Sequence, residues 1–481
     1  MPVSAHYHPR PSYPSLGRRF FTVASPARFD GLKIRYRNQR WADRLGLGEF
    51  GDAEWLAHFG RFEPLPDNLT EALALPYHGH QFHRYNPDLG DGRGVVLAEL
   101  IDPEDERRLV LNTKGSGETA FSRDLDGRLT LKGAIREALA AEMLEALGVY
   151  TSKILSIVET GETVYRPDEP RPQRGAVIVR LSHGMLRIGS FQRLAAMGDV
   201  EALQALTAFA TTEYLPEARS KPAKKCGAAL MAAASDRLAR MVAGWMVAGF
   251  AHGVLNTDNM SITGESFDFG PYHFLSTYDR AFVPASFDEN GLYAFGRQPT
   301  EVLWDVQQLA RALAPVAPAR ALAEPVGQFR SAFVEHLRRS FLGRIGIAPR
   351  SEAEDDALVE EVFAYVSGHA VPYQQFLHDW HGDALGVARA AHSPAAPHYQ
   401  DSAFTELRQR FADRRPASDD ADPFFRRPAP CVLDDATIRS ICTAIDERDD
   451  WEPFTAKLDE IDRTRRALRI DPGVHGHLPL I

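Results

Sequence analysis

The strongest constraint in this sequence is a polar loop that follows a long apolar helix. The run Asp236–Phe250 (DRLARMVAGWMVAGF) is predicted to form the helix, and it leads into His252–Gly270 (HGVLNTDNMSITGESFDFG). Within this loop, Asn259 offers an amide oxygen and Asp268 offers a carboxylate. Mg²⁺ prefers hard oxygen ligands and usually takes one or two protein carboxylates besides phosphate oxygens and water. The pair therefore predicts a metal site for a phosphate-bearing ligand.

The order of these residues is that of the catalytic and metal-binding loops of protein kinases. In kinases, an Asn of the catalytic loop and the Asp of Asp-Phe-Gly hold the metal ions. Here Asn259 and Asp268-Phe269-Gly270 match that order, but Val254 occupies the place of the catalytic Asp, five residues before Asn259. Either motif alone is common in turns, because Asp and Gly are frequent there. Together, behind a long helix, they favour a modified kinase-like site.

A glycine-rich turn upstream indicates where phosphates would bind. Leu89–Gly94 reads LGDGRG and directly precedes a predicted strand, Val95–Leu100. Gly90 and Gly92 would let the backbone approach a phosphate, and Arg93 adds a cation with a planar donor fork. An ordinary hairpin would look the same, so this turn supports the interpretation only in combination with the other motifs.

A lysine and a glutamate have the spacing of the kinase ion pair that positions the phosphate-binding lysine. Lys114 follows the predicted strand Arg108–Asn112, and Glu137 comes 23 residues later in a predicted helix. In kinases such a strand-to-helix pair is required for activity. Glu137 could instead pair locally with Lys132 or Arg136, and a surface pair of that kind would contribute little.

Two arginines occupy a segment that borders the adenine pocket in ordinary kinases and is apolar there. Arg180 and Arg187 lie seven residues apart in Gly175–Phe191 (GAVIVRLSHGMLRIGSF). Guanidinium groups suit phosphates far better than a purine ring. The alternative is that both are solvated surface arginines, which is the usual location of this residue.

The missing catalytic Asp and the two arginines together suggest an inverted nucleotide. If ATP bound the other way round, its β- and γ-phosphates would meet Arg180 and Arg187, and its α-phosphate would lie at the metal site. Pyrophosphate would then be the leaving group, and AMP would be transferred. Asp258, next to Asn259, could accept the proton of the attacking hydroxyl.

The distribution of predicted elements indicates an α+β fold with two lobes. Strand-like runs and one amphipathic helix, Lys132–Leu147, occupy the first part of the chain, and helical patterns dominate from Val200 onward. The Pro- and Ala-rich stretch Ala391–Pro430 is predicted to be a linker before a last charged helix, Asp434–Arg466. We expect a protein-kinase-like fold with a small strand-rich N-lobe, a mostly helical C-lobe and a helical C-terminal extension, spanning residues 1–190, 191–345 and 346–481.

Charge and cysteine content narrow the range of partners and compartments. The formal net charge of −10 argues against nucleic acid or an anionic membrane as a ligand. Cys226, Cys431 and Cys442 are too few and too scattered for a disulfide framework or a zinc site. We therefore expect a cytoplasmic protein that holds its anionic ligand through a local cluster of basic side chains.

The combined motifs resemble those of the selenoprotein O (YdiU) family of kinase-like protein adenylyltransferases. The resemblance extends from about Tyr13 to Leu313 and is most specific in the run HGVLNTDNMSI. The other matching segments are LGDGRG, TKGSGETAFSR with LDGR, IREAL, the pair Arg180 and Arg187, DFGPY, and GLYAFGRQP before Trp304.

This resemblance implies transfer of AMP from an inverted ATP to Ser, Thr or Tyr hydroxyls of proteins, with the chain itself as one candidate acceptor. It implies that Asp258 is the proton acceptor and that Asn259 and Asp268 bind Mg²⁺ or Mn²⁺. It also makes Glu137 the helix partner of Lys114. The residues it assigns to ATP binding are Gly90, Gly92, Arg93, Lys114, Asp126, Gly127, Arg180, Arg187 and Asp268.

Two other functions stay open from the residues alone. A small-molecule phosphotransferase of the aminoglycoside-kinase type shares the loop pattern H-G-D-x-x-x-x-N, but Val254 and the two arginines count against it. A non-catalytic pseudokinase would bind nucleotide only as a scaffold. A scaffold is less favoured, because the chain retains the residues expected for nucleotide and metal binding: Lys114, Glu137, Asn259 and Asp268.

Overall fold

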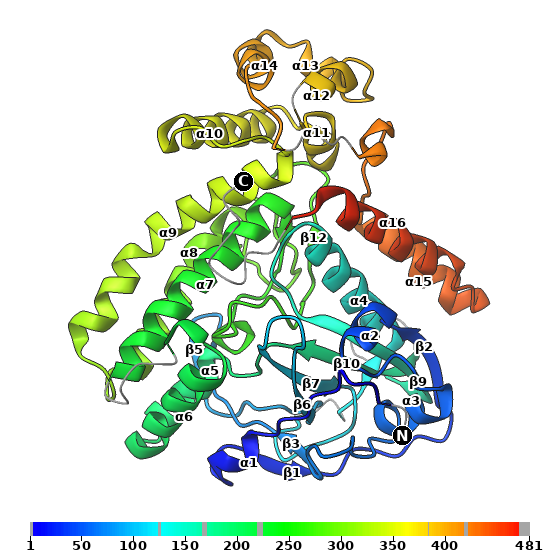
Figure 1. Ribbon diagram of the computed structural model, residues 1–481, viewed down its shortest axis with the longest axis vertical. Helices are drawn as coiled ribbons and strands as arrows, with labels where there is room; N and C mark the ends of the chain where they lie inside the picture. The colour runs from blue at the N-terminus through cyan, green and yellow to red at the C-terminus, as the bar shows by residue number, and fades with distance from the viewer. Residues whose placement is uncertain are drawn as a thin grey trace.

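The computed structural model describes residues 3–123, 127–165, 171–218, 225–382, 384–417 and 422–470. In these ranges the chain forms a mixed α+β structure, in which one antiparallel sheet lies beside a larger group of helices (Figure 1). The predicted α+β class is therefore confirmed.

The main sheet has eight strands, and all of its pairings are antiparallel. Two small hairpins stand apart from it. The sheet order is β1 (Thr22–Ala24), β3 (Ala72–Ala74), β6 (Val96–Ile101), β7 (Arg108–Lys114), β10 (Gln173–Ser182), β9 (Lys153–Val164) and β2 (Lys33–Arg37), and β8 (Leu129–Thr130) pairs with β10. The hairpins are β4 (Gly79–Gln81) with β5 (Arg84–Asn86), and β11 (Phe250–Ala251) with β12 (His273–Phe274).

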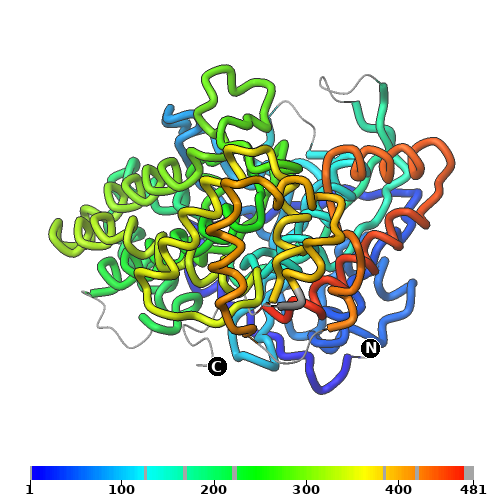
Figure 2. The backbone as a smooth tube through the Cα atoms, turned by 90° about the horizontal axis from the view of Figure 1, so that it is seen from above, coloured from blue at the N-terminus to red at the C-terminus, as the bar shows by residue number. Residues whose placement is uncertain are grey.

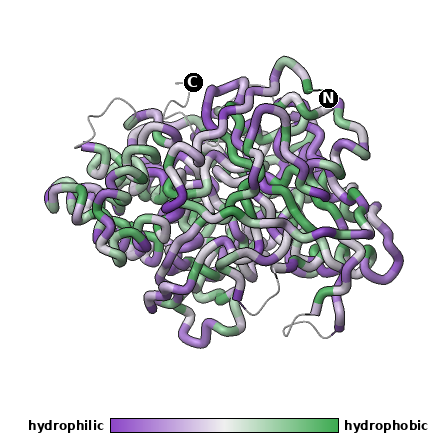
Figure 3. The backbone as a smooth tube through the Cα atoms, turned by 90° about the horizontal axis from the view of Figure 1, so that it is seen from below, coloured by the Kyte–Doolittle hydropathy of each residue, from purple (hydrophilic) through white to green (hydrophobic). Residues whose placement is uncertain are grey.

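The central strands are buried because both of their faces are covered. Alternate side chains of a strand point to opposite faces, so Val110 and Ile178 join a large core that includes α4 (Leu131–Ala146). Their neighbours Leu111 and Val179 join a second core, built on α2 (Gln39–Arg44) and α3 (Asp52–Phe59). In Figure 3 the hydrophobic colour accordingly runs through the interior segments, and many outer loops are hydrophilic.

Most of the helices that follow the sheet in sequence form two groups, one beside the sheet and one beyond α9 (Ala319–Ile345) (Figure 1). None of the helices in the described ranges combines the length and the apolar character that crossing a membrane requires. The group beside the sheet contains α5 (Ile188–Ala196), α6 (Val200–Glu213), α7 (Cys226–Ala248), α8 (Gln298–Leu313) and α9. The second group contains α10 (Glu352–Gly368), α11 (Tyr373–Asp379), α12 (Ala384–Ala390), α13 (Ala396–Tyr399) and α14 (Thr405–Ala412).

The stretch expected to be a linker contains short helices instead. Helices α13 and α14 lie within it, and its side chains Tyr399, Phe404 and Phe411 are buried around Trp380. Because these helices are short, they show too little periodicity to be detected in the sequence.

The last charged helix is in fact two helices, α15 (Asp435–Arg448) and α16 (Glu452–Leu468). Asp449 ends α15 in the left-handed conformation, with φ of 51°, and Pro453 lies in the first turn of α16. The prediction of one continuous helix was wrong, although the proline was a visible signal of the break. Both helices run beside α4 (Figures 1 and 2).

Candidate active site

The loop predicted to bind metal connects the two strands of a small hairpin. Strands β11 and β12 pair, and the loop of residues 252–272 between them contains a 3₁₀ turn, Thr257–Asn259, followed by Asp268. Asp268 has φ of 57°, a left-handed conformation that only a few per cent of non-glycine residues adopt. A backbone hydrogen bond of 2.9 Å from Ile188 to Met260 ties this loop to the start of α5.

Lys114 and Glu137, whose spacing predicted a kinase-like ion pair, lie in direct contact. Lys114, the last residue of β7, forms an ion pair with Glu137 of α4, and its Nζ lies 2.6 Å from Asp268 Oδ1. Both partners of the first pair are buried. Arg136, one of the local alternatives, donates instead to the backbone carbonyl of Tyr272 at 3.1 Å.

Arg180 and Arg187 are buried side chains, with 2% and 3% of their surface exposed. The alternative of two solvated surface arginines is therefore wrong. Arg180 comes from β10, and its Nη2 lies 3.0 Å from Glu137 Oε2 and 3.3 Å from Asp268 Oδ1. It thus shares both carboxylates with the lysine.

Arg187 reaches the same cluster from the N-terminus of α5. Its Nη1 donates to the backbone carbonyl of Asp258 at 2.9 Å, and its Nη2 lies 3.3 Å from Asp91 Oδ1. The rings of Tyr77 and Phe267 flank the guanidinium, with centroids at 4.2 and 4.9 Å. Asp91 lies inside the LGDGRG turn, between the two glycines that were predicted to approach phosphate. It was not itself predicted to be a partner of Arg187.

Asp268 lies among three cationic side chains, those of Lys114, Arg180 and Arg187. Burial alone would raise the pKa of Asp268, but the nearby cations outweigh burial and hold this pKa well below its usual range. Three cations therefore lie together around one carboxylate, an arrangement in which phosphate oxygens could take the place of that carboxylate.

The glycine-rich turn is in close contact with the segment that follows β7. A Cβ atom at Gly90 would lie 2.3 Å from the ring of Phe121, and one at Gly92 would lie 2.7 Å from its carbonyl oxygen. Neither position can therefore carry a side chain without moving that segment.

The remaining predicted ATP-binding residues lie near this turn, with one exception. The carbonyl oxygen of Arg93 accepts a 2.6 Å hydrogen bond from the N–H of Gly115. The guanidinium group of Arg93 helps to lower the pKa of Asp268. Gly127 has φ of 71°, and its carbonyl accepts from the N–H of Gly117. Asp126 lies outside the described residues.

Asp258, the predicted proton acceptor, is 8% exposed, and burial raises its pKa to about 6. Its Oδ1 has no hydrogen-bond partner among the described residues. A Cβ atom at Gly79 would lie 3.1 Å from this oxygen, so the glycine lets the β4 backbone approach Asp258 closely. A carboxylate with a pKa near neutrality and an unused oxygen is suited to accept a proton from a substrate.

The neighbouring Asn259 fits the requirements of a divalent cation. Its Nδ2 donates to the carbonyl of Val254 at 3.1 Å, which leaves the amide oxygen as an available ligand. Together with Asp268 and the unpaired oxygen of Asp258, the described residues offer only oxygen ligands here, as Mg²⁺ or Mn²⁺ prefers.

The β4–β5 hairpin holds the loop in place, a role that the sequence reasoning missed. The backbone N–H of His80 donates to Thr257 Oγ1 at 2.7 Å, and this hydroxyl donates to Gln192 Oε1 of α5, also at 2.7 Å. The N–H of Phe82 donates to Asn256 Oδ1 at 3.3 Å. These bonds join two residues of the loop to elements far away in sequence, so no local pattern could have revealed them.

A second acidic cluster lies elsewhere in the fold. Asp102, Asp105 and His183 are close enough to one another to hold a metal ion. However, Arg44 and Arg107 each lie 2.6 Å from one of these carboxylates. Since the acids are already neutralised, we assign no metal to them.

Comparison with known proteins identifies relatives along nearly the whole chain. A family described as protein adenylyltransferase SelO matches residues 3–462. A protein nucleotidyltransferase YdiU of Synechocystis is 37% identical over 469 residues, which cover 92% of this chain and 95% of the relative. Proteins of the same name from Trichodesmium erythraeum and Aeromonas hydrophila are 34% and 40% identical, covering 95% and 69% of this chain and 98% and 67% of their own length.

Proposed function

The chain belongs to the SelO family, and from this premise we propose that it transfers AMP from ATP to Ser, Thr or Tyr hydroxyls of proteins and releases pyrophosphate. The family assignment confirms the predicted family and the predicted class of nucleotidyltransferase, for which ATP is the co-substrate. The observation that supports the finer proposal is the buried cluster of Lys114, Arg180 and Arg187 around Asp268.

We further propose that the sheet with α4 and the helices α5 to α9 correspond to the two lobes of a kinase-like fold. The Lys114–Glu137 pair supports this, because it connects a sheet strand to a helix as the kinase pair does. The predicted boundaries at residues 190 and 345 stay predictions.

In the proposed complex, the triphosphate replaces the carboxylate of Asp268 as the partner of the buried cations. The β- and γ-phosphates then lie at Lys114, Arg180 and Arg187, and the α-phosphate lies toward Asp258. Charge supports this proposed orientation, because the three cations lie together at one buried place.

Asn259 and Asp268 would hold Mg²⁺ or Mn²⁺, which neutralises phosphate charge when bound. The oxygen of the acceptor hydroxyl attacks the α-phosphorus and gives its proton to Asp258. The bond from the α-phosphorus to the bridging oxygen breaks, and pyrophosphate leaves with its negative charge held by the buried cations. Acceptor proteins, including the chain itself, would present the hydroxyl to Asp258, whose Oδ1 has no hydrogen-bond partner among the described residues.

The pKa of Asp258 predicts how the activity depends on pH. Because a base must be deprotonated to act, kcat/KM for ATP should be constant above the pKa of about 6 and should fall about tenfold per pH unit below it. Initial rates between about pH 5 and 8 at constant ionic strength test this. A profile that stays flat through pH 6 would remove Asp258 from the role of base.

The two arginines test the orientation of the nucleotide. Arg180→Ala and Arg187→Ala should each weaken ATP binding by at least about tenfold while changing AMP binding little, since AMP lacks the β- and γ-phosphates. Calorimetric Kd values for both nucleotides measure this, and the exposed Arg297, at 50% side-chain exposure, supplies a control in Arg297→Ala. Equal weakening of both nucleotides would place the arginines at another part of the ligand.

A further inference from the structure

Helix α16 at the end of the described chain packs along α4, the helix that carries Glu137. Ile461 and Leu468 of α16 belong to the same buried core as Leu139 and Met143 of α4. The two helices lie in contact, as Figures 1 and 2 also show. Since α16 follows α4 by about 300 residues, this contact links the end of the chain to the proposed nucleotide site.

A largely buried charge cluster reinforces this contact. Arg465 of α16 forms ion pairs with Glu142 and Glu145 of α4, and its Nε lies 3.5 Å from Glu145 Oε2. The acidic side chains are 6% and 11% exposed, and that of Arg465 is 19% exposed. In such surroundings the loss of one charged partner is far more damaging than at the surface.

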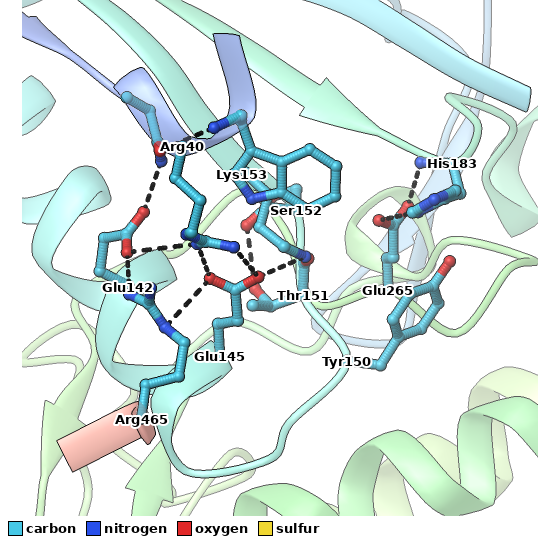
Figure 4. Close-up of polar contacts among 12 residues, drawn as sticks. Arg40, Glu142, Glu145, Tyr150, Thr151, Ser152, Lys153, His183, Glu265 and Arg465 are labelled. Atoms are coloured by element: carbon cyan, nitrogen blue, oxygen red, sulfur yellow. Dashed lines mark hydrogen bonds and ion pairs between the residues drawn. The ribbon is translucent and has the colours of Figure 1, made fainter. Parts of the chain in front are cut away.

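The same carboxylates also bind the sheet side of the molecule. Arg40 of α2 pairs with Glu145, and Lys153 Nζ of β9 lies 3.8 Å from Glu145 Oε1. Figure 4 shows Arg40, Lys153 and Arg465 converging on Glu142 and Glu145 from different elements. Cations from α2, β9 and α16 therefore meet at the same two carboxylates of α4.

A second contact lies next to Glu137 itself. The guanidinium of Arg136 lies 4.6 Å from the ring centroid of Tyr272, just after the Asp-Phe-Gly segment, and 3.9 Å from Asp435 Oδ1 at the start of α15. Tyr272 in turn donates its hydroxyl to the carbonyl of Arg136 at 2.7 Å. The two C-terminal helices thus contact α4 near Glu137 and also about 12 Å further along its axis, at 1.5 Å per residue.

We propose that α15 and α16 form an intramolecular clamp that holds α4 where Glu137 meets Lys114, with Arg465 as a positioning residue for that pair. The proposal rests on the nucleotide-binding role given to Lys114 under the proposed function. A rigid helix transmits a shift of its far end to Glu137, and a misplacement of about 1 Å at a reacting site can cost about 100-fold in rate. Arg465 contacts α4 through Glu142 and Glu145, which are not among the residues proposed to bind the nucleotide, so its proposed effect is exerted through α4.

The test compares Arg465→Gln with Arg466→Gln in the full-length chain. Arg466 is the adjacent residue, but its side chain is 69% exposed and it pairs with Asp462 of its own helix at 3.0 Å, so it is a matched control. Hydrogen exchange of the amides of residues 131–146 reports on α4, and kcat and KM for ATP report on the site. Rates are measured at least ~15 °C below the unfolding midpoint of each variant, so that the folded state is compared.

Arg465→Gln should speed exchange in α4 and lower kcat/KM for ATP by at least about tenfold, whereas Arg466→Gln should match the wild type. Arg465→Lys keeps the positive charge and should partly restore both slow exchange in α4 and kcat/KM for ATP. If the glutamine variant folds poorly, the lysine variant still tests the proposal. Unchanged exchange in α4 would overturn the clamp, and faster exchange with unchanged kinetics would overturn the positioning role. If the wild type transferred no AMP, the proposed function would fail, and α4 exchange together with the Kd for ATP would still decide the clamp.

Discussion

Replacing Asp268 by alanine is expected to lower the rate of AMP transfer at least about 100-fold. The carboxylate is one of two proposed metal ligands, and loss of one preorganised electrostatic group in an active site typically costs about 10²- to 10³-fold in kcat. Steady-state transfer of label from ATP measures the effect. Asp279→Ala changes an exposed aspartate of a nearby turn and should leave the rate unaffected.

Asp268→Ala is also expected to change the binding of ATP in the absence of metal. Without Asp268, the cations Lys114, Arg180 and Arg187 lose a carboxylate partner. Metal-free ATP should consequently bind at least as tightly as to the wild type, even though transfer is lost. Near-normal turnover would exclude Asp268 from the metal site, and greatly weakened metal-free binding would mean that the residue supports the fold instead.

Asp258→Asn should also lower transfer by at least about 100-fold, with little change in ATP affinity. General base catalysis contributes about 10²- to 10⁴-fold, and an amide cannot accept the proton. Since Asp258 Oδ1 has no hydrogen-bond partner in the described part of the chain, the amide breaks no existing bond of that atom, so the protein should remain folded. Transfer rates, Kd for ATP and the unfolding temperature are measured together.

The expected result is a loss confined to kcat. A parallel rise in Kd for ATP would mean that Asp258 binds the nucleotide or its metal rather than accepting a proton. Residual activity of Asp258→Asn should also lose the dependence on pH near 6 that the wild type is expected to show. If the variant kept that dependence, another group would be the base.

The parts of the site that follow from local spacing could be predicted from the sequence. Lys114 ends β7 and Glu137 lies in α4, 23 residues later, and Asn259 and Asp268 share a single loop. The α+β class followed in the same way, because periodicities of strands and helices are local properties. The kinase-like lobes and the roles of individual residues are not fixed by such patterns and stay proposals.

Features that depend on contacts between distant segments could not be predicted. The sequence left open whether Arg180 and Arg187 are solvated, because their neighbours come from other segments of the chain. Phe267 lies beside both guanidinium groups, and Tyr77 and Asp91 contact that of Arg187. The contact between Glu142 and Arg465 joins residues 323 positions apart, and nothing in either local sequence indicates the other. Long-range pairings of this kind become visible only in the folded chain.

The position of the transferred phosphorus tests the central claim most directly. The chain is incubated with Mg²⁺ or Mn²⁺ and with ATP labelled with ³²P at either the α- or the γ-phosphate, and protein-bound label and released pyrophosphate are measured. We expect label from the α position on protein, with the chain itself as one acceptor, release of pyrophosphate, and no label from the γ position. Transfer of γ-label without α-label would contradict the account and identify a phosphotransferase, and intact ATP binding without transfer of either label would identify a scaffold.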